Sequence, residues 1–300
     1  MGLEYARQLA ASGCGVVMVS NQQRELEQCA AELRAAYSAE IWPVYCDLAR
    51  NESADELFGI CQEKGLQIDI LINNAGMFFF KELKDEVCEV GDKMLFLHVI
   101  TPTRLCERFA EGMKQRGRGY ILNVSSVAAG MHVPGLVMYS ATKSYLRSFS
   151  QSWYYEMKFY GVSVTAVCPG AVSTGLYSVL PALVKILKVA GKFGLVYSPE
   201  KLVRKALKAM FRRRRCVTPG WFNLLFAPAV NALPKWVVSK IWRELKVGGL
   251  ELVDNSGGSE DGAAGIGANT SVASNADSPT ATAGSQAAQK MRKIKAVLLL

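Results

Sequence analysis

The sequence predicts an α/β protein built on a doubly wound parallel sheet. Short apolar runs rich in β-branched residues alternate with longer amphipathic helical stretches, and small or polar residues directly follow the runs. Strands that are apolar throughout are typical of a parallel sheet covered on both faces. With 300 residues and 50% hydrophobic side chains, the chain can bury a large core, which excludes global disorder. Ligands of such sheets bind at the carboxyl ends of the strands.

The elements follow one another in a regular order. Strands are expected at residues 15–20, 41–46, 68–73, 119–125 and 162–168. The helices between and after them are expected at residues 24–37, 53–64, 85–116 and 137–160. A further helix begins after Ser198, a good N-cap ahead of Pro199, and continues to the arginines at 212–215.

The start of the chain lacks a strand that this fold requires. Residues 1–13 have a helical pattern, with Leu3, Ala6 and Leu9 on one face, and nothing precedes them. A Rossmann-type unit opens with a strand and a glycine-rich turn that holds a diphosphate at a helix N-terminus. We therefore expect the first strand, a central one, and most of that turn to be missing. Our hypothesis is that Met1 is an internal methionine, which the upstream reading frame would test.

The positive charge of the chain is concentrated late in the sequence. The formal net charge is +9, yet residues 181–246 alone hold 15 lysines and arginines against two glutamates. Residues 221–250 form a basic amphipathic extension rich in Trp, Phe and Leu. It fits an extra helical layer, a helix on an anionic membrane surface, or a subunit contact. Nucleic-acid binding is not expected, because the charge coincides with apolar bulk and no known binding module is present.

Residues 251–300 are interpreted as a low-complexity, disordered tail. Gly, Ser, Ala, Thr and Asn dominate as far as residue 289, and such a segment buries too little apolar surface to offset its ordering entropy. Residues 290–300, KMRKIKAVLLL, are interpreted as a frayed end, with a weak anchor as the alternative. No apolar run reaches the ~18 residues of a membrane span.

Cysteine and histidine usage gives no sign of disulfides or metal. The eight cysteines are scattered through apolar runs, without a C-x-x-C pair or a secretory signal, so reduced thiols in a cytoplasmic protein are expected. The two histidines, His98 and His132, are too few for a typical zinc site, and no metal is expected.

Tyr139, Lys143 and Ser126 form the strongest chemical signal. Tyr139 and Lys143 are four residues apart on one helix face, where an ammonium can lower the phenol pKa of ~10. Ser126 lies 13 residues before Tyr139 at the end of a strand, where its hydroxyl can bind a carbonyl oxygen. The pattern predicts proton transfer to or from a carbonyl oxygen.

Other motifs follow neighbouring strands at the same edge of the predicted sheet. They are Asp47, the run from Asn73 to Gly76, and the run from Pro169 to Thr174. Together and in this order, these elements resemble the classical short-chain dehydrogenase/reductase family over residues 2–215. The branch most similar contains hydroxysteroid dehydrogenases and 3-oxoacyl reductases.

The resemblance implies a role for each matching residue. Tyr139 would be the general acid/base, Lys143 would lower its pKa and hold the nicotinamide ribose, and Ser126 would orient the substrate carbonyl. His98 stands where the family usually has an Asn that completes a catalytic tetrad through a water relay. A histidine can still hold a water, but it brings charge and bulk, so a relay and a purely structural role both remain open.

The resemblance also implies a nicotinamide dinucleotide as cofactor. The matching positions are Gly2, Asp47, Leu48, Asn74, Ala75, Gly76, Tyr139, Lys143, Pro169, Gly170, Val172 and Thr174. Selectivity depends on the end of the strand at residues 15–20, where an acidic residue would bind the ribose of NAD. Ser20, Asn21 and Arg24 stand there instead, which favours NADP(H) over NAD(H).

These expectations combine into one functional hypothesis. Residues 1–220 form the cofactor-binding domain, with a substrate lid at about 176–212, and interconvert a ketone and a secondary alcohol on a lipophilic substrate, steroid-like or long-chain 3-oxoacyl. The family implies a homodimer or homotetramer formed by the helices that carry His98 and Tyr139. The alternative is a catalytically impaired, cofactor-sensing scaffold that associates peripherally with a membrane.

Overall fold

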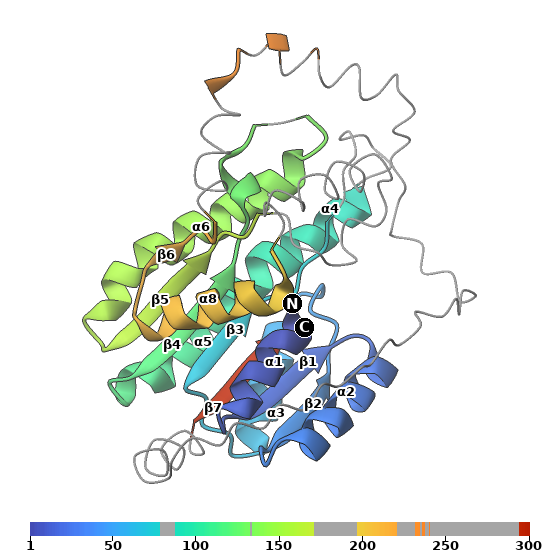
Figure 1. Ribbon diagram of the computed structural model, residues 1–300, viewed down its shortest axis with the longest axis vertical. Coiled ribbons are helices and arrows are strands. Elements are labelled where there is room, and N and C mark those ends of the chain that lie inside the picture. Colours follow the sequence, from blue (N-terminus) through green and yellow to red (C-terminus); the bar gives the residue numbers. More distant parts are fainter. Residues whose placement is uncertain are drawn as a thin grey trace.

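The computed structural model describes residues 1–78, 88–132, 134–170, 197–220, 232–234, 236, 237, 240 and 294–300. A seven-stranded sheet lies at its centre, with the strand order β2-β1-β7-β3-β4-β5-β6 and only parallel pairings (Figure 1). Its strands are β1 (Gly15–Ser20), β2 (Ile41–Tyr45), β3 (Ile70–Asn73), β4 (Gly119–Val124), β5 (Val162–Val167), β6 (Cys216–Val217) and β7 (Lys295–Leu299). The α/β fold-class prediction is confirmed.

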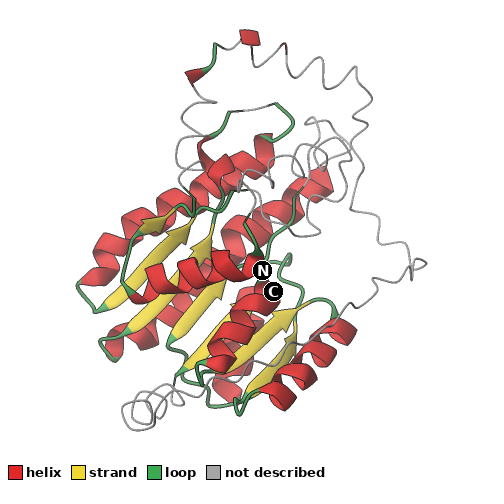
Figure 2. Ribbon diagram, viewed as in Figure 1, coloured by secondary structure: helices red, strands yellow, loops and turns green. Residues whose placement is uncertain are grey.

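Helices cover both faces of this sheet, as Figure 2 shows. They are α1 (Gly2–Ala11), α2 (Gln23–Ala36), α3 (Ser53–Glu63), α4 (Cys88–Leu95), α5 (Thr101–Gln115), α6 (Val137–Lys158) and α8 (Pro199–Phe211). The helices α1, α2 and α8 pack on one face, while α3, α5 and α6 pack on the other. Both faces of the strands are therefore buried, which is why each strand reads as a continuous apolar run.

The central strand comes from the far end of the chain. The strand β7 pairs with β1 on one side and β3 on the other, and its residues Ala296, Val297 and Leu298 are completely buried. If β7 is counted first, the strand order reads 3-2-1-4-5-6-7, the doubly wound Rossmann order. The interpretation of residues 290–300 as a frayed end was wrong for β7, because alternate side chains of this strand fill both hydrophobic cores.

The long helix expected at residues 85–116 is divided. A π-helical turn, η2 (Phe96–Ile100), separates α4 from α5 and carries His98, which is 1% exposed. Such turns insert one extra residue and are frequent at functional sites. Pro102 follows in the first turn of α5, where its missing N–H costs least.

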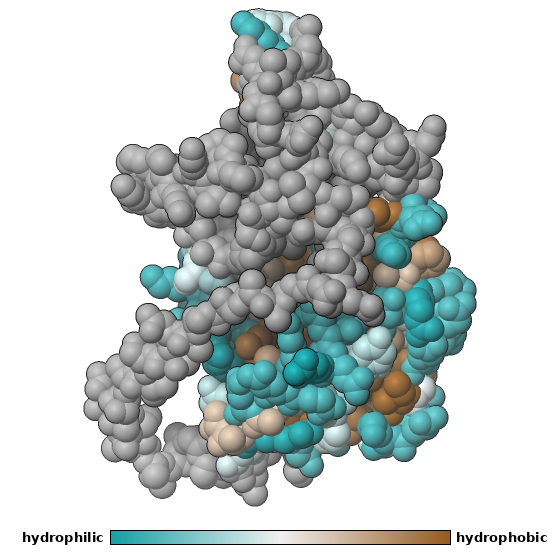
Figure 3. Space-filling model, turned by 90° about the vertical axis from the view of Figure 1, so that its right-hand side faces the viewer, coloured by the Kyte–Doolittle hydropathy of each residue, from teal (hydrophilic) through white to brown (hydrophobic). Residues whose placement is uncertain are grey.

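The last described helix also ends earlier than expected. The helix α8 ends at Phe211, and Arg213 adopts a left-handed conformation with φ 54°. The chain then turns into the short edge strand β6, which the sequence analysis did not predict. On the face seen in Figure 3, hydrophilic side chains cover most of the described surface and hydrophobic ones form small separate groups.

Candidate active site

Ser126 and Tyr139 meet at the carboxyl end of β4. Ser126 follows this strand and caps the short 3₁₀ helix η3 (Val127–Gly130), where its hydroxyl accepts a hydrogen bond from the Ala128 amide at 3.1 Å. Tyr139 lies in the first turn of α6, and a hydrogen bond joins its side chain to Ser126. Both are nearly buried, at 6% and 7% exposed. A hydroxyl pair of this kind can hold one carbonyl oxygen between them.

The neighbouring serines fix this arrangement without taking part in it. The Ser125 hydroxyl donates to the backbone carbonyl of Lys143 at 2.7 Å, and so ties β4 to α6. The Ser140 hydroxyl contacts the carbonyl oxygens of Ala128 and Met131 at 2.8 and 2.6 Å, which ties η3 to the same helix. The serine that faces Tyr139 is therefore Ser126.

Lys143 lies one helical turn beyond Tyr139 and is 4% exposed. Its ammonium donates to the carbonyl oxygen of Val124 at 3.0 Å and lies 5.9 Å from the centre of the Tyr139 ring. Burial lowers the pKa of Lys143 to about 8. A buried ammonium with one protein acceptor has further N–H groups to offer a ligand.

The pKa of Tyr139 differs from the sequence expectation. Desolvation raises this pKa, and the hydrogen bond from Ser126 opposes the rise. The lowering that we expected from Lys143 is not what governs the phenol in this state, because the loss of water around the ring outweighs it.

His98 connects three segments around this pair. Its Nε2 accepts a hydrogen bond from the Met77 amide at 3.0 Å, and its Nδ1 lies 3.0 Å from Thr142 Oγ1. Since Nε2 is an acceptor, the neutral ring carries its proton on Nδ1 and donates to Thr142, which itself donates to the carbonyl of Tyr139 at 3.0 Å. Burial, and then the charge of Lys143, lower the pKa of His98 well below its usual value.

Gly76 leaves room for this contact. A Cβ added at Gly76 would lie 3.0 Å from His98 Nε2 and 3.4 Å from Lys143 Nζ. The segment at Gly76 therefore packs directly against His98 and against Lys143 of α6. His98 and Gly76 were expected at the site from the sequence, whereas their neighbours Thr142 and Met77 were not, since neither residue type signals such a contact.

The topological switch point lies between β7 and β3. Asn74 follows β3 and its Nδ2 donates to the carbonyl of Leu299 at 3.2 Å, while its Oδ1 is buried without a protein partner. A Cβ added at Gly2 would lie 2.8 Å from the Leu300 side chain and 3.1 Å from Asn74 Nδ2. The beginning of α1 therefore lies against the ends of both strands, where ligands of this fold bind (Figure 1).

The remaining cofactor positions lie along the same edge. Asn21 and Arg24 are exposed after β1, and Ser20 Oγ accepts from the Gln22 amide at 3.2 Å. Asp47 accepts from the amide of Ala49 at 3.0 Å, whereas the Leu48 side chain is buried in the core. The structure thus places accessible polar side chains after β1, whereas Leu48 after β2 is buried.

The start of the loop after β5 contacts η3 next to Ser126. The Val127 amide of η3 donates to the carbonyl of Pro169 at 3.0 Å, and Gly170 is buried beside it. Val172, Thr174 and most of the expected lid lie outside the described residues, as do most of the basic extension and residues 251–293.

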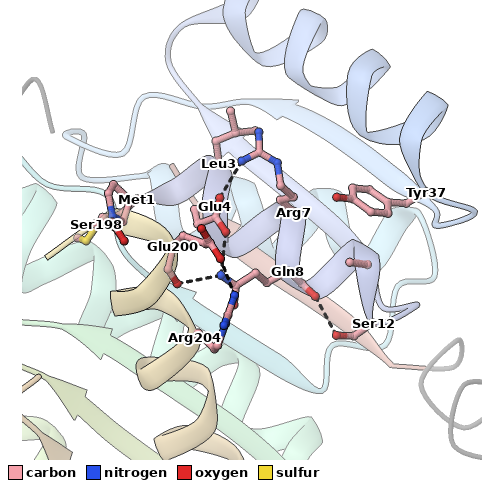
Figure 4. A pocket seen from close by; sticks show the side chains of 12 residues that line it. Met1, Leu3, Glu4, Arg7, Gln8, Ser12, Tyr37, Ser198, Glu200 and Arg204 are labelled. Atoms are coloured by element: carbon pink, nitrogen blue, oxygen red, sulfur yellow. Dashed lines mark hydrogen bonds and ion pairs between the residues drawn. The ribbon is translucent and has the colours of Figure 1, made fainter. Parts of the chain in front are cut away.

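A separate groove of about 780 Å³ runs between α1 and α8 (Figure 4). Its polar side chains pair with one another. Gln8 Nε2 contacts Glu4 Oε1 at 2.7 Å and the Glu200 carbonyl at 3.1 Å, and Arg204 pairs with the Glu200 carboxylate at 2.5 Å. The contact from Gln8 to the Glu200 carbonyl joins the two helices, and the other two contacts lie within one helix each.

Comparison with known proteins decides the family. The sequence model described as short chain dehydrogenase matches residues 1–182. The chain belongs to the short-chain dehydrogenase family. Its members interconvert ketones and alcohols with a nicotinamide cofactor, and the chain is an oxidoreductase of this class.

Two relatives of this short-chain dehydrogenase agree with the branch expected from the motifs. The very-long-chain 3-oxoacyl-CoA reductase of Homo sapiens is 31% identical over 250 residues, which cover 80% of this chain and 74% of the relative. The 17-beta-hydroxysteroid dehydrogenase type 3 of Danio rerio is 27% identical over 248 residues, which cover 79% and 75%.

Solved structures agree as well. A short-chain dehydrogenase from Sphingobium yanoikuyae, in complex with NADPH, is 25% identical with a TM-score of 0.64 and covers 86% of this chain and 95% of its own. Within the described residues, no helix is long and apolar enough to cross a membrane. The same part of the chain holds no cluster of three metal-ligating side chains.

Proposed function

We propose that this short-chain dehydrogenase is an NADP(H)-dependent reductase or dehydrogenase in which Tyr139 transfers the proton at the substrate oxygen. The observation that carries the proposal is the hydrogen-bonded Ser126–Tyr139 pair beside the buried ammonium of Lys143. Tyr139 and Lys143, one turn apart on α6, and Ser126, which follows β4, bring three groups that donate or exchange protons together at the carboxyl edge of the sheet.

The residues present fit a nicotinamide dinucleotide. The buried Asn74 Oδ1 lacks a protein partner, Lys143 has N–H groups to spare, and Gly2 and Gly76 lie where a side chain would collide with the walls of the site. Asn74, Lys143 and the start of α1 would hold the cofactor along the strand ends. When bound, the cofactor supplies or accepts the hydride.

The side chains of this protein carry out the proton transfer. Ser126 donates a hydrogen bond to the substrate oxygen and fixes it beside the phenol. Tyr139 then gives its proton to this oxygen during reduction, and takes it back during oxidation. Because burial raises the pKa of Tyr139, the phenol stays protonated at neutral pH and serves as the acid. The Lys143 ammonium stabilises the phenolate that remains.

The cofactor and substrate classes follow from weaker observations. Ser20, Asn21 and Arg24 present hydroxyl, amide and guanidinium groups where a 2′-phosphate would lie, which supports NADP(H). The similar Sphingobium protein was solved with NADPH. The relatives named for 3-oxoacyl-CoA and hydroxysteroid substrates support a lipophilic ketone or alcohol.

Replacing one hydroxyl tests the proposal. Tyr139→Phe should lower turnover of ketosteroids and long-chain 3-oxoacyl thioesters with NADPH by about 10²–10⁴-fold, while NADPH fluorescence still reports binding. The matched control is Tyr145→Phe on the same helix, whose hydroxyl contacts Thr103 on the outer face, 3.0 Å away. If Tyr139→Phe and Tyr145→Phe turn over substrate equally fast, Tyr139 is not the proton donor.

One observation favours the alternative, a cofactor-binding scaffold that does not catalyse. The His98 ring makes direct protein contacts on both nitrogens, at the position where the family usually has an Asn that serves a water relay. The same assay separates the two functions, since NADPH binding without turnover of any ketone would favour the scaffold.

We also propose that the outer face of α6 forms a subunit contact. Tyr145, Phe149 and Trp153 stack along this face with ring centres 5.8 and 5.3 Å apart, and Phe159 is 89% exposed at the end of the helix. An aromatic stripe on a surface helix is typical of an interface core. Light scattering of the full chain is the check, and a homodimer or homotetramer is the expected result.

A further inference from the structure

Two cysteines lie in contact at the edge of the sheet nearest the loop after β5. The sulfur atoms of Cys168 and Cys216 are 4.0 Å apart. Cys216 pairs with Ala166 in the parallel ladder, and Cys168 lies two residues after Ala166, directly beyond the end of β5, so both side chains point to the same face. The Cys168 amide also donates to the carbonyl of Val217 at 2.8 Å, which holds the two segments in register.

The two thiols are chemically unequal. The hydrogen bond with Cys168, together with Arg147 and Arg215, lowers the pKa of Cys216, which is partly exposed. Cys168 is 1% exposed, and its contact with Cys216 and its burial raise its pKa. An accessible thiolate beside a second, protonated thiol is the arrangement of a reactive cysteine with its resolving partner.

Other cysteines in the described residues differ from this pair. Burial raises the pKa of Cys14, Cys61 and Cys106, which lie within the core. A buried thiol with a raised pKa holds little thiolate and is unreactive. Cys216, whose pKa is lowered, departs from this pattern, and Cys168 is the buried thiol that contacts it.

We propose that Cys168 and Cys216 form a redox modification site, which hydrogen peroxide converts to a reversible disulfide. The Cys216 thiolate attacks one peroxide oxygen, so that an S–O bond forms, the O–O bond breaks and the leaving hydroxide takes a proton to become water. The Cys168 sulfur then attacks Cys216, so that the S–S bond forms, the S–O bond breaks, and the Cys168 proton leaves in a second water. Two thiols lose two electrons and one peroxide gains them.

The disulfide would act on the cofactor site through the loop after β5. A disulfide bond is about 2.05 Å long, so the sulfurs must approach by about 2 Å. The two-residue edge strand β6 and the segment from Cys168 to Gly170 must move to allow this. Pro169 bonds to η3, next to Ser126, so we expect the oxidised protein to bind NADPH more weakly. This consequence, unlike the disulfide itself, rests on the proposed function.

Peroxide treatment of the full chain tests both parts. Non-reducing peptide mapping should show one cross-linked peptide containing Cys168 and Cys216, with a mass about 2 Da below the two thiol peptides. NADPH affinity should fall about fivefold or more and recover with dithiothreitol. Cys216→Ser should lose both effects, whereas the control Cys29→Ser, at another partly exposed cysteine, should keep both.

The outcomes separate the two proposals. Absence of the cross-linked peptide, or its appearance only in urea, would overturn the modification site. A cross-link with NADPH affinity changed less than about twofold would overturn the coupling. Reduced protein that does not bind NADPH would instead overturn the proposed function, and the peptide map would still decide whether the disulfide forms.

Discussion

The two halves of the candidate site are assembled in different ways. The half that we propose for proton transfer lies within one short stretch of sequence, because Ser126, Tyr139 and Lys143 all belong to the β4–η3–α6 unit. The half that we propose for the dinucleotide joins Gly2 on α1, Asn74 after β3 and Leu299 on β7, so that contacts such as Asn74 Nδ2 to Leu299 O span 225 residues. One half depends on local geometry, and the other depends on the sheet being complete.

Because of this difference, we expect substitutions in the two halves to affect different properties, namely turnover in one and the stability of the fold in the other. Ser126 and Tyr139 are held by two side-chain hydrogen bonds, from Ser125 after β4 to the α6 backbone and from Ser140 on α6 to the η3 backbone, which form once these neighbours pack. The proposed cofactor end requires β7 to enter between β1 and β3, which carries a larger loop-closure cost but buries the apolar residues from Ala296 to Leu299. We expect damage to β7 to act on the whole fold, and damage to the active-site residues to act on chemistry with smaller effects on stability.

The largest effect on stability is expected from the core of β7. Leu298→Ala should lower the free energy of unfolding by about 2–5 kcal/mol, because Leu298 is completely buried and the cavity cannot fully collapse. Urea denaturation is the measurement. Leu122→Ala on β4 is the matched control, since this leucine is equally buried in the same cluster. If Leu298→Ala lowers the free energy of unfolding by less than about 0.5 kcal/mol while Leu122→Ala lowers it by the expected amount, β7 is not part of the sheet.

An opposite and smaller effect is expected at Lys143. Lys143→Met should raise the free energy of unfolding at pH 7 by about 1–3 kcal/mol while it abolishes turnover, because the buried ammonium costs stability. The pKa of Lys143 in the folded state is about 8, below its unfolded value, so this cost is complete below pH 8 and is relieved as the pH rises toward about 10.5.

Urea denaturation at pH 7 and pH 10 checks this prediction. The advantage of Lys143→Met should shrink at the higher pH. A variant that is destabilised at pH 7 would show that the hydrogen bond to Val124 outweighs the desolvation of the ammonium.

The smallest effect is expected at His98, and it depends on pH. The pKa of His98 is lowered by burial, so the folded state holds this ring neutral while the unfolded chain takes up a proton below about pH 6.5. Stability from this residue is therefore present above pH 6.5 and is lost as the pH falls below it, by about 1 kcal/mol per pH unit. His98→Asn should remove that slope between pH 6 and 5.

The exposed His132→Asn is the control for this measurement and should keep the slope. An unchanged slope in His98→Asn would mean that the ring is protonated in the folded state, which contradicts its acceptor role toward the Met77 amide. A pH profile of turnover for the same variant would show whether the ring positions Lys143 or only fills space.

The sequence by itself determined the parallel α/β class, the strands from 15–20 to 162–168, and the approach of Ser126 to Tyr139. These follow from continuous apolar runs between amphipathic helical stretches, from the four-residue spacing of Tyr139 and Lys143, and from strand ends that meet at one edge of the sheet. The π-helical turn at His98 and its bond to Met77 did not follow, because the apolar spacing of residues 85–116 fits an uninterrupted helix equally well.

Only the tertiary structure decided which segment supplies the central strand. The run KAVLL at 295–299 is short, follows a polar tail, and gives no local sign of its partners. Its place is determined by the gap between β1 and β3, whose unpaired backbone groups and apolar faces it completes. Because β7 is stabilised by pairing with β1 and β3, its position follows from the assembled sheet and cannot be predicted from its own five residues.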